Sequence, residues 1–66
     1  MKGHLAVLDY STSMVNIHNF IDVEDHLSET YEKYIKDNTD YNEDEIEWLS
    51  SNQPIQVYYH PADSIE

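Results

Sequence analysis

The chain has 66 residues, and 14 aspartates and glutamates against three lysines give it a formal net charge of −11. Such a charge repels phosphate groups, so it argues against direct binding to nucleic acids and to anionic membranes. The chain contains no cysteine, which excludes disulfides, thiolate zinc sites and thiol catalysis.

The length accommodates one small domain, residues 1–66, and a domain of this size buries only about 60% of its unfolded surface. Its stability is therefore expected to be marginal or supplemented by assembly. No apolar stretch approaches the roughly 20 residues of a membrane span. The apolar run 5–8 is too short for the core of a signal peptide, so we expect a cytoplasmic protein.

The first 20 residues have the pattern of a β-hairpin. Residues 3–10 are apolar and favour a buried strand, whereas residues 14–20 alternate between apolar and polar side chains. The polar cluster 10–13 between them lacks glycine, which predicts a loop longer than the tight Asn-Gly type. The expected register places four aliphatic residues on one sheet face: Leu5, Val7, Val15 and Ile17.

A helix is predicted over residues 23–37. Asp22 is of a type that caps helices at their amino end, and Glu24 and Asp25 suit the positive end of the helix dipole. Apolar side chains recur at the three- and four-residue spacing of a helix with one buried face. These are Val23, Leu27, Tyr31, Tyr34 and Ile35.

A second helix is predicted over residues 43–50. Asn42 precedes it as a capping residue, and Glu45 stands at the third helical position as the partner in a capping box. Alternating apolar and polar side chains then predict a last strand over residues 54–60. Residues 62–66 are expected to fray.

These elements predict an α+β domain of two layers with the order ββααβ. Its sheet has three strands, is mostly antiparallel and has the order 2-1-3, because the most apolar strand belongs in the middle. Two helices cover one sheet face. The other face then exposes apolar side chains, which usually mark an interface and here predict a homodimer. These are Ala6, Leu8, Tyr10, Met14, Phe20 and Tyr58.

Catalytic and ligand-binding signatures are missing from the sequence. The serines lack the flanking glycines of a nucleophile elbow, and no histidine stands in a motif. The acidic segment 37–45 superficially resembles a calcium loop, but a register begun at Asp40 puts Glu45 where the turn requires glycine. We therefore expect no enzyme activity, no cofactor and no specific metal ion.

The acidic residues are concentrated in one part of the chain, since 11 of the 14 lie between Asp22 and Glu47. They predict an anionic surface that attracts basic protein surfaces over roughly 8 Å at physiological salt. Trp48 and Tyr58 fall off the main apolar stripes, which makes them the aromatic candidates for contact. The candidate interaction residues are Glu24, Glu29, Glu32, Asp37, Asp40, Glu43, Asp44, Glu47, Trp48 and Tyr58.

Three interpretations of this surface are open. The favoured one is a small acidic, non-enzymatic protein-interaction module that self-associates or binds a basic protein surface. The alternative is a nucleic-acid mimic, in which rows of carboxylates on the helices imitate phosphates and occupy the site of a DNA- or RNA-binding protein. In the third, the acids provide only solubility.

Overall fold

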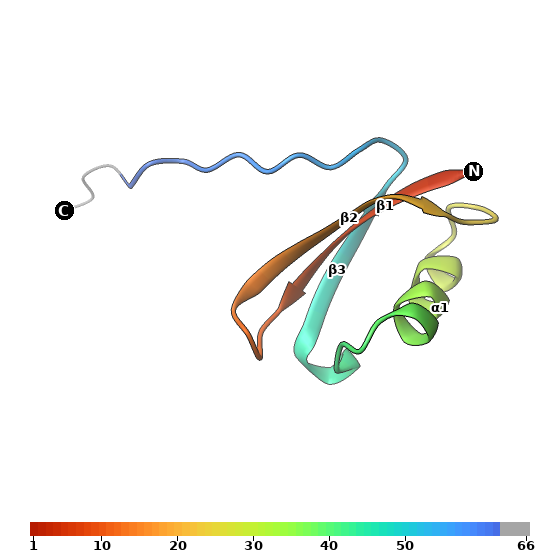
Figure 1. Ribbon diagram of the computed structural model, residues 1–66, viewed down its shortest axis with the longest axis horizontal. Coiled ribbons are helices and arrows are strands. Elements are labelled where there is room, and N and C mark those ends of the chain that lie inside the picture. Colours follow the sequence, from red (N-terminus) through yellow and green to blue (C-terminus); the bar gives the residue numbers. More distant parts are fainter. Residues whose placement is uncertain (63–66) are drawn as a thin grey trace.

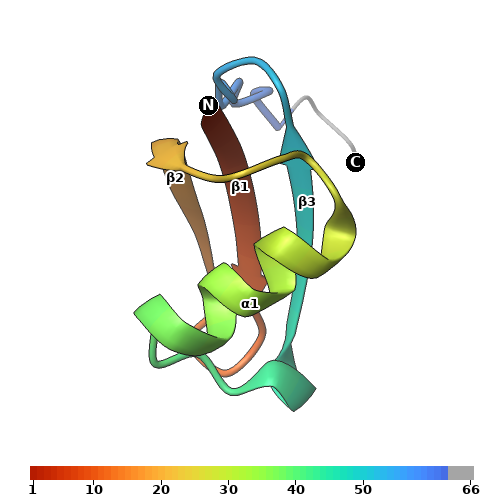
Figure 2. The same cartoon turned by 90° about the vertical axis from the view of Figure 1, so that its right-hand side faces the viewer.

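A computed structural model describes residues 1–62 of the chain. The elements in chain order are β1 (Lys2–Asp9), β2 (Met14–Asp22), α1 (Ser28–Asn38), the 3₁₀ turn η1 (Glu43–Glu45) and β3 (Ile46–Ser51). The three strands form one antiparallel sheet in the order β2-β1-β3. Helix α1 crosses one face of this sheet (Figures 1 and 2). The α+β class and the strand order 2-1-3 are thus confirmed.

The core lies between α1 and the central strand. Leu5 and Val7 of β1 are fully buried, and Tyr31 and Ile35 of α1 pack against them together with Val23. Burial of side chains of this size contributes roughly 1.5–3 kcal/mol each, so this cluster supplies much of the hydrophobic stabilisation. Of the predicted helix stripe, Tyr31 and Ile35 are buried on α1, whereas Leu27 is 60% exposed and Val23 lies before the helix.

Gly3 makes room for the Tyr31 ring. A Cβ atom at Gly3 would lie 2.9 Å from Tyr31 Cζ and closer still to the Tyr31 hydroxyl oxygen. Real Cβ atoms do not approach other atoms so closely, so a larger residue would have to displace the Tyr31 ring. The only glycine of the chain thus stands where the Tyr31 side chain packs directly on β1.

The hairpin loop is confirmed, but the register predicted from it is wrong. Asp9 stands opposite Met14, so residues 10–13 form the loop, and Leu8 stands opposite Val15. Directly opposed residues lie on the same sheet face, and successive residues alternate between faces. Val15 and Ile17 therefore share a face with Ala6 and Leu8, away from Leu5 and Val7, because a one-residue difference in register moves every side chain to the other face.

Strand β2 contains a bulge near its end. Leu5 pairs with His18 and Gly3 with Ile21, so Asn19 and Phe20 together oppose His4. Phe20 adopts a φ of 63°, a conformation that costs a bulky side chain roughly 1–2 kcal/mol. Its N–H donates to Nδ1 of the buried His4 at 3.0 Å. The imidazole thus supplies the acceptor that the interrupted strand pairing lacks.

The predicted helix over 23–37 begins five residues too early. Asp22 ends β2 and pairs with the Lys2 ammonium group instead of capping a helix, and Val23 still donates its N–H to the Met1 carbonyl. The sheet therefore keeps this segment extended. Asp25 accepts hydrogen bonds from the Leu27 N–H and the Thr30 hydroxyl just before α1 begins.

No helix among the described residues is long and apolar enough to cross a membrane.

The predicted second helix over 43–50 is wrong after its first turn. The Asn42 side chain accepts from the Asp44 N–H as expected, but η1 ends at Glu45. Residues 46–51 form β3, because they pair with residues 4–9 on the second edge of β1. The described part of the chain therefore contains one α-helix, and the third strand of the sheet is 46–51 rather than 54–60.

Residues 52–62 form an extended segment, which we call the arm. It leaves the end of β3 and runs to the side of the sheet opposite α1 (Figure 1). The Asn19 side chain holds its base, since Oδ1 accepts from the Ile55 N–H at 2.9 Å and Nδ2 donates to the Ile55 carbonyl at 3.0 Å. The predicted strand over 54–60 forms no ladder with the described residues. The expected fraying over 62–66 lies, beyond residue 62, outside the described residues.

Candidate functional site

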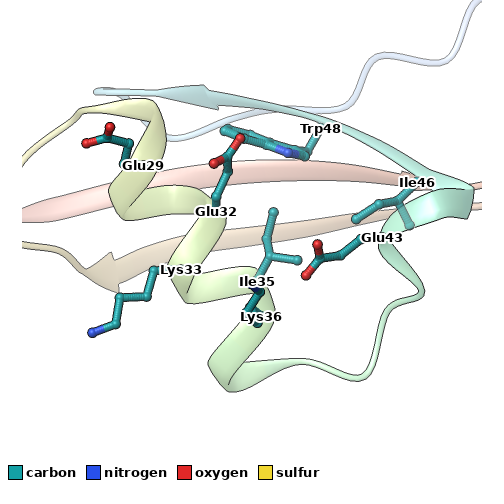
Figure 3. A pocket seen from close by; sticks show the side chains of 8 residues that line it. All are labelled: Glu29, Glu32, Lys33, Ile35, Lys36, Glu43, Ile46 and Trp48. Carbon is teal, nitrogen blue, oxygen red and sulfur yellow. The ribbon is translucent and has the colours of Figure 1, made fainter.

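A groove with a volume of about 460 Å³ lies between α1, η1 and β3 (Figure 3). We call it the acidic groove. Its lining comes from all three elements and consists of Glu29, Glu32, Lys33, Ile35, Lys36, Glu43, Ile46 and Trp48. It therefore combines three carboxylates, two ammonium groups and three large apolar side chains.

The apolar floor of the acidic groove follows from the pairing of β3. Trp48 stands opposite Val7 and Ile46 opposite Asp9, so both side chains lie on the face that α1 covers. The Trp48 ring stacks on Tyr31 with 6.3 Å between ring centroids and 30° between ring planes. The indole is half-buried, and its remaining surface borders the groove.

The carboxylates come from the flank of α1 that is next to β3, and from η1. Glu29 and Glu32 are three residues apart, so they lie on the same side of the helix. In Figure 3 the Glu32 carboxylate reaches toward Trp48, the Glu43 carboxylate lies near Ile35, and Lys33 extends away from Trp48.

The groove carboxylates have no partner within the part of the chain that the structure describes. The one ion pair found there joins Lys2 to Asp22, on another part of the surface. None of the side-chain hydrogen bonds between described residues includes Glu29, Glu32 or Glu43, although Lys33 and Lys36 are near. These oxygens are therefore available to a ligand that carries hydrogen-bond donors.

The other predicted site residues are dispersed. Glu24 and Asp37 line a shallower hollow of about 210 Å³ on the flank of α1 toward β2. Asp40 and Asp44 are exposed in the connection around η1. Glu47 stands opposite Leu8, on the other face of the sheet, where it accepts a hydrogen bond from the Tyr10 hydroxyl at 2.8 Å. This bond raises the pKa of Tyr10.

Tyr58 lies on the arm, and its ring centroid is 4.5 Å from that of His60. The structure thus brings together four of the ten predicted residues: Glu29, Glu32, Glu43 and Trp48. Sequence reasoning assigned Ile35 to the apolar helix stripe and did not identify Ile35 or Ile46 as the floor of a groove. Alternation along 46–48 was the signal that could have placed Ile46 and Trp48 on one face.

The histidines of the folded part have structural partners. His18 Nε2 shares a hydrogen bond with the Tyr41 hydroxyl at 2.7 Å, and His26 Nδ1 shares one with the Tyr31 hydroxyl at 2.8 Å. Burial, with the nearby Asp9 charge as a smaller cause, raises the pKa of Tyr41. Among residues 1–62, no group of three or more histidine, aspartate or glutamate side chains is placed to hold a metal ion.

The fold and the groove together define a small acidic α+β protein with the element order ββαβ, in which a single helix covers one sheet face. Comparisons with protein-family models, with curated proteins and with solved structures gave no match to the chain.

Proposed function

We propose that the chain is a small non-enzymatic protein-interaction module that binds a basic segment of a partner protein in the acidic groove. One observation supports this above all: an apolar floor lies directly beside three carboxylates that have no partner among residues 1–62. A lysine or arginine side chain has the matching composition, because an aliphatic stem carries a charged head.

Each part of a lysine or arginine side chain has a counterpart in the groove. Its stem packs against Ile35, Ile46 and the Trp48 indole, and its head donates hydrogen bonds to the groove carboxylates. A cation beside the Trp48 ring gains further attraction from the ring quadrupole. The apolar floor distinguishes this groove from a general anionic surface, which offers only charge.

The net charge supports the same proposal at longer range. With −11 on 66 residues, the chain attracts basic partners before contact and accelerates their association at low ionic strength. The groove then provides the local specificity. Raising the salt concentration is expected to slow association more than it weakens the completed apolar contact.

The nucleic-acid mimic receives less support from the placement of the acids. Glu29, Glu32 and Glu43 lie at the groove, whereas Glu24 lies on the other flank of α1 and Glu47 on the opposite sheet face. A mimic requires its carboxylates in continuous rows, so each acid along a row would contribute. The groove proposal instead assigns the binding to the three acids at one place.

Trp48 is the only tryptophan of the chain, so its fluorescence reports occupation of the groove directly. We would titrate the protein with a hexa-arginine peptide at low salt, and with a hexa-glutamate peptide as the control ligand. Glu32→Gln and its matched control Glu47→Gln each remove one negative charge. Glu32→Gln is expected to weaken binding about tenfold, because it removes a charged hydrogen-bond acceptor, whereas Glu47→Gln leaves binding within about twofold.

Equal losses in both variants would contradict the groove and favour binding by charge alone. A wild-type protein whose fluorescence does not respond to the arginine peptide would overturn the proposal. The mimic predicts a further result: a nucleic-acid-binding protein captured from lysate at low salt should be lost to a similar extent with Glu24→Gln, Glu32→Gln and Glu47→Gln.

A further inference from the structure

The sheet face opposite α1, which we call the back face, is apolar and uncovered. Val15, Phe20 and Leu49 are 59%, 61% and 55% exposed. They surround the central strand on a face whose apolar members are Ala6, Leu8, Val15, Ile17, Phe20 and Leu49. Figure 1 shows α1 on the other side of the sheet, and no described element lies across this one. A continuous apolar surface of this kind marks a contact with another molecule.

The arm, residues 52–62, has the side-chain pattern of a strand but pairs with no strand of the described sheet. Ile55, Val57 and Tyr59 alternate with polar residues in the manner of a strand with one buried face. Val57, Tyr58 and Tyr59 are all exposed. Asn19 anchors the base of the arm on β2, and from there the arm runs away from its own domain on the back-face side (Figure 1).

The distribution of charge limits how a second copy can approach. Two chains of −11 repel one another, most strongly if their helix sides meet, because Glu29, Glu32 and Glu43 would then be brought together. The back face carries few charges, and they have partners within the chain. Glu47 accepts the Tyr10 hydroxyl, and Asp22, at the end of the sheet, pairs with Lys2. Contact through the back face leaves both acidic grooves on the outside.

We propose that the chain forms a two-fold homodimer in which the arm of each copy packs on the back face of the other. Residues 54–60 span about 23 Å when extended, which is close to the roughly 26 Å of the eight-residue strand β1. Aromatic side chains bury about 150–250 Å² each. Phe20 and Tyr59, which shares one side of the extended arm with Ile55 and Val57, therefore supply a substantial part of the roughly 800 Å² that each partner contributes to a stable interface. The arrangement is isologous, so both copies make the same contacts.

Light scattering coupled to size exclusion tests the dimer, with the full chain loaded at roughly 100 μM. The expected mass is twice the 7.8 kDa of one chain. Leu49→Glu is expected to raise the dissociation constant about a hundredfold, because it places an unpaired carboxylate in the interface. Leu27→Glu is the matched control. Leu27 is 60% exposed at the start of α1, so this substitution adds the same charge away from the back face.

Val57→Glu provides a second disruption that does not depend on the fold of the sheet, because it lies on the arm. It is also expected to yield a monomer. A wild-type chain that elutes at 7.8 kDa would overturn the proposal, as would a dimer that persists in both Leu49→Glu and Val57→Glu.

Disulfide cross-linking tests where the arm lies. The chain has no native cysteine, so only the introduced cysteines can form disulfides. Leu49→Cys and Val57→Cys are made as separate full-length variants, mixed in equal amounts and oxidised. A mixed disulfide requires Cα atoms within about 7 Å, so it forms if the arm of one chain reaches the back face of the other. Leu27→Cys mixed with Val57→Cys is the control. A dimer whose Leu49→Cys and Val57→Cys chains do not cross-link more than the control pair would refute the exchange of arms.

Discussion

The two faces of the sheet contain residues from the same central strand and have opposite properties. Leu5 and Val7 of β1 point toward α1 and are fully buried. The intervening Ala6 and Leu8 point to the back face, where Ala6 is buried and Leu8 half-buried between exposed side chains of β2 and β3. The helix side is closed over a core and has acids at its rim. The back face is apolar and has no second layer, because the chain contains a single helix among its described residues. The core therefore lies on one face of the sheet, and the self-association that we propose uses the other.

The largest expected effect comes from truncating matched leucines on the two faces. Leu5→Ala removes a fully buried side chain and is expected to cost about 3 kcal/mol of unfolding free energy, whereas Leu49→Ala costs less than about 1 kcal/mol in the monomer. Urea denaturation at low protein concentration, followed by circular dichroism, measures both. Similar losses from the two variants would remove the distinction between a structural face and a binding face.

A smaller cost is expected where α1 approaches β1. Gly3→Ala drives a methyl group into the Tyr31 ring and is expected to cost about 1–3 kcal/mol. Because the nearest atom is the Tyr31 hydroxyl oxygen, part of this loss should disappear in the Tyr31→Phe background. A double-mutant cycle in denaturant gives the coupling directly. If the losses of unfolding free energy in Gly3→Ala and Tyr31→Phe are additive, contact with the Tyr31 hydroxyl does not cause the destabilisation by Gly3→Ala.

The bulge of β2 allows a test near the back face. His4→Ala removes the acceptor for the Phe20 N–H and is expected to cost about 1–2 kcal/mol, since a partly buried donor then lacks its partner within the chain. Amide hydrogen exchange should show the Phe20 N–H losing protection first. His26→Ala is the comparison on the helix side. His26 is exposed, so its removal lets water reach the Tyr31 hydroxyl, and the cost should be smaller. A larger loss of unfolding free energy in His26→Ala than in His4→Ala would contradict this prediction.

The smallest expected effect is a pH dependence on the helix side. The Thr30 hydroxyl and the Leu27 N–H lower the pKa of Asp25 below its usual 3.8. A carboxyl group with a lowered pKa in the folded state stabilises the fold above about pH 4, and this contribution is lost as the pH falls through the folded-state pKa. Asp25→Asn should therefore lower the melting temperature more at pH 7 than near pH 3. An equal difference at both pH values would show that the charge of Asp25 contributes nothing.

Local patterns were sufficient for several elements. The loop at 10–13, the buried central strand and the buried positions Tyr31 and Ile35 depend on residues close in sequence, and all were predicted. The cap at Asn42 was also correct, because it needs only the next two residues. These features form from short-range interactions that the sequence displays directly.

The predictions were wrong where contacts between residues that are distant in the sequence determine the secondary structure. Asp22 has the side chain of a helix cap, yet pairing of β2 with β1 keeps it in the sheet. Glu43–Glu45 begins as a helix would, but hydrogen bonding to β1 continues the chain as β3. Four candidate site residues became neighbours only through that pairing, because it turns Trp48 toward α1 and Glu47 away from it. Tertiary pairing thus overrode local preference.

The sequence by itself determined the acidity of the chain, its α+β class and its central strand. Composition and short-range periodicity are properties of the residues, so they do not depend on the fold. The tertiary structure alone decided which segment became the third strand, which acids gather around Trp48 and which apolar residues face outward on the back face. These outcomes depend on register, and register is set by hydrogen bonds between segments that are far apart in the chain.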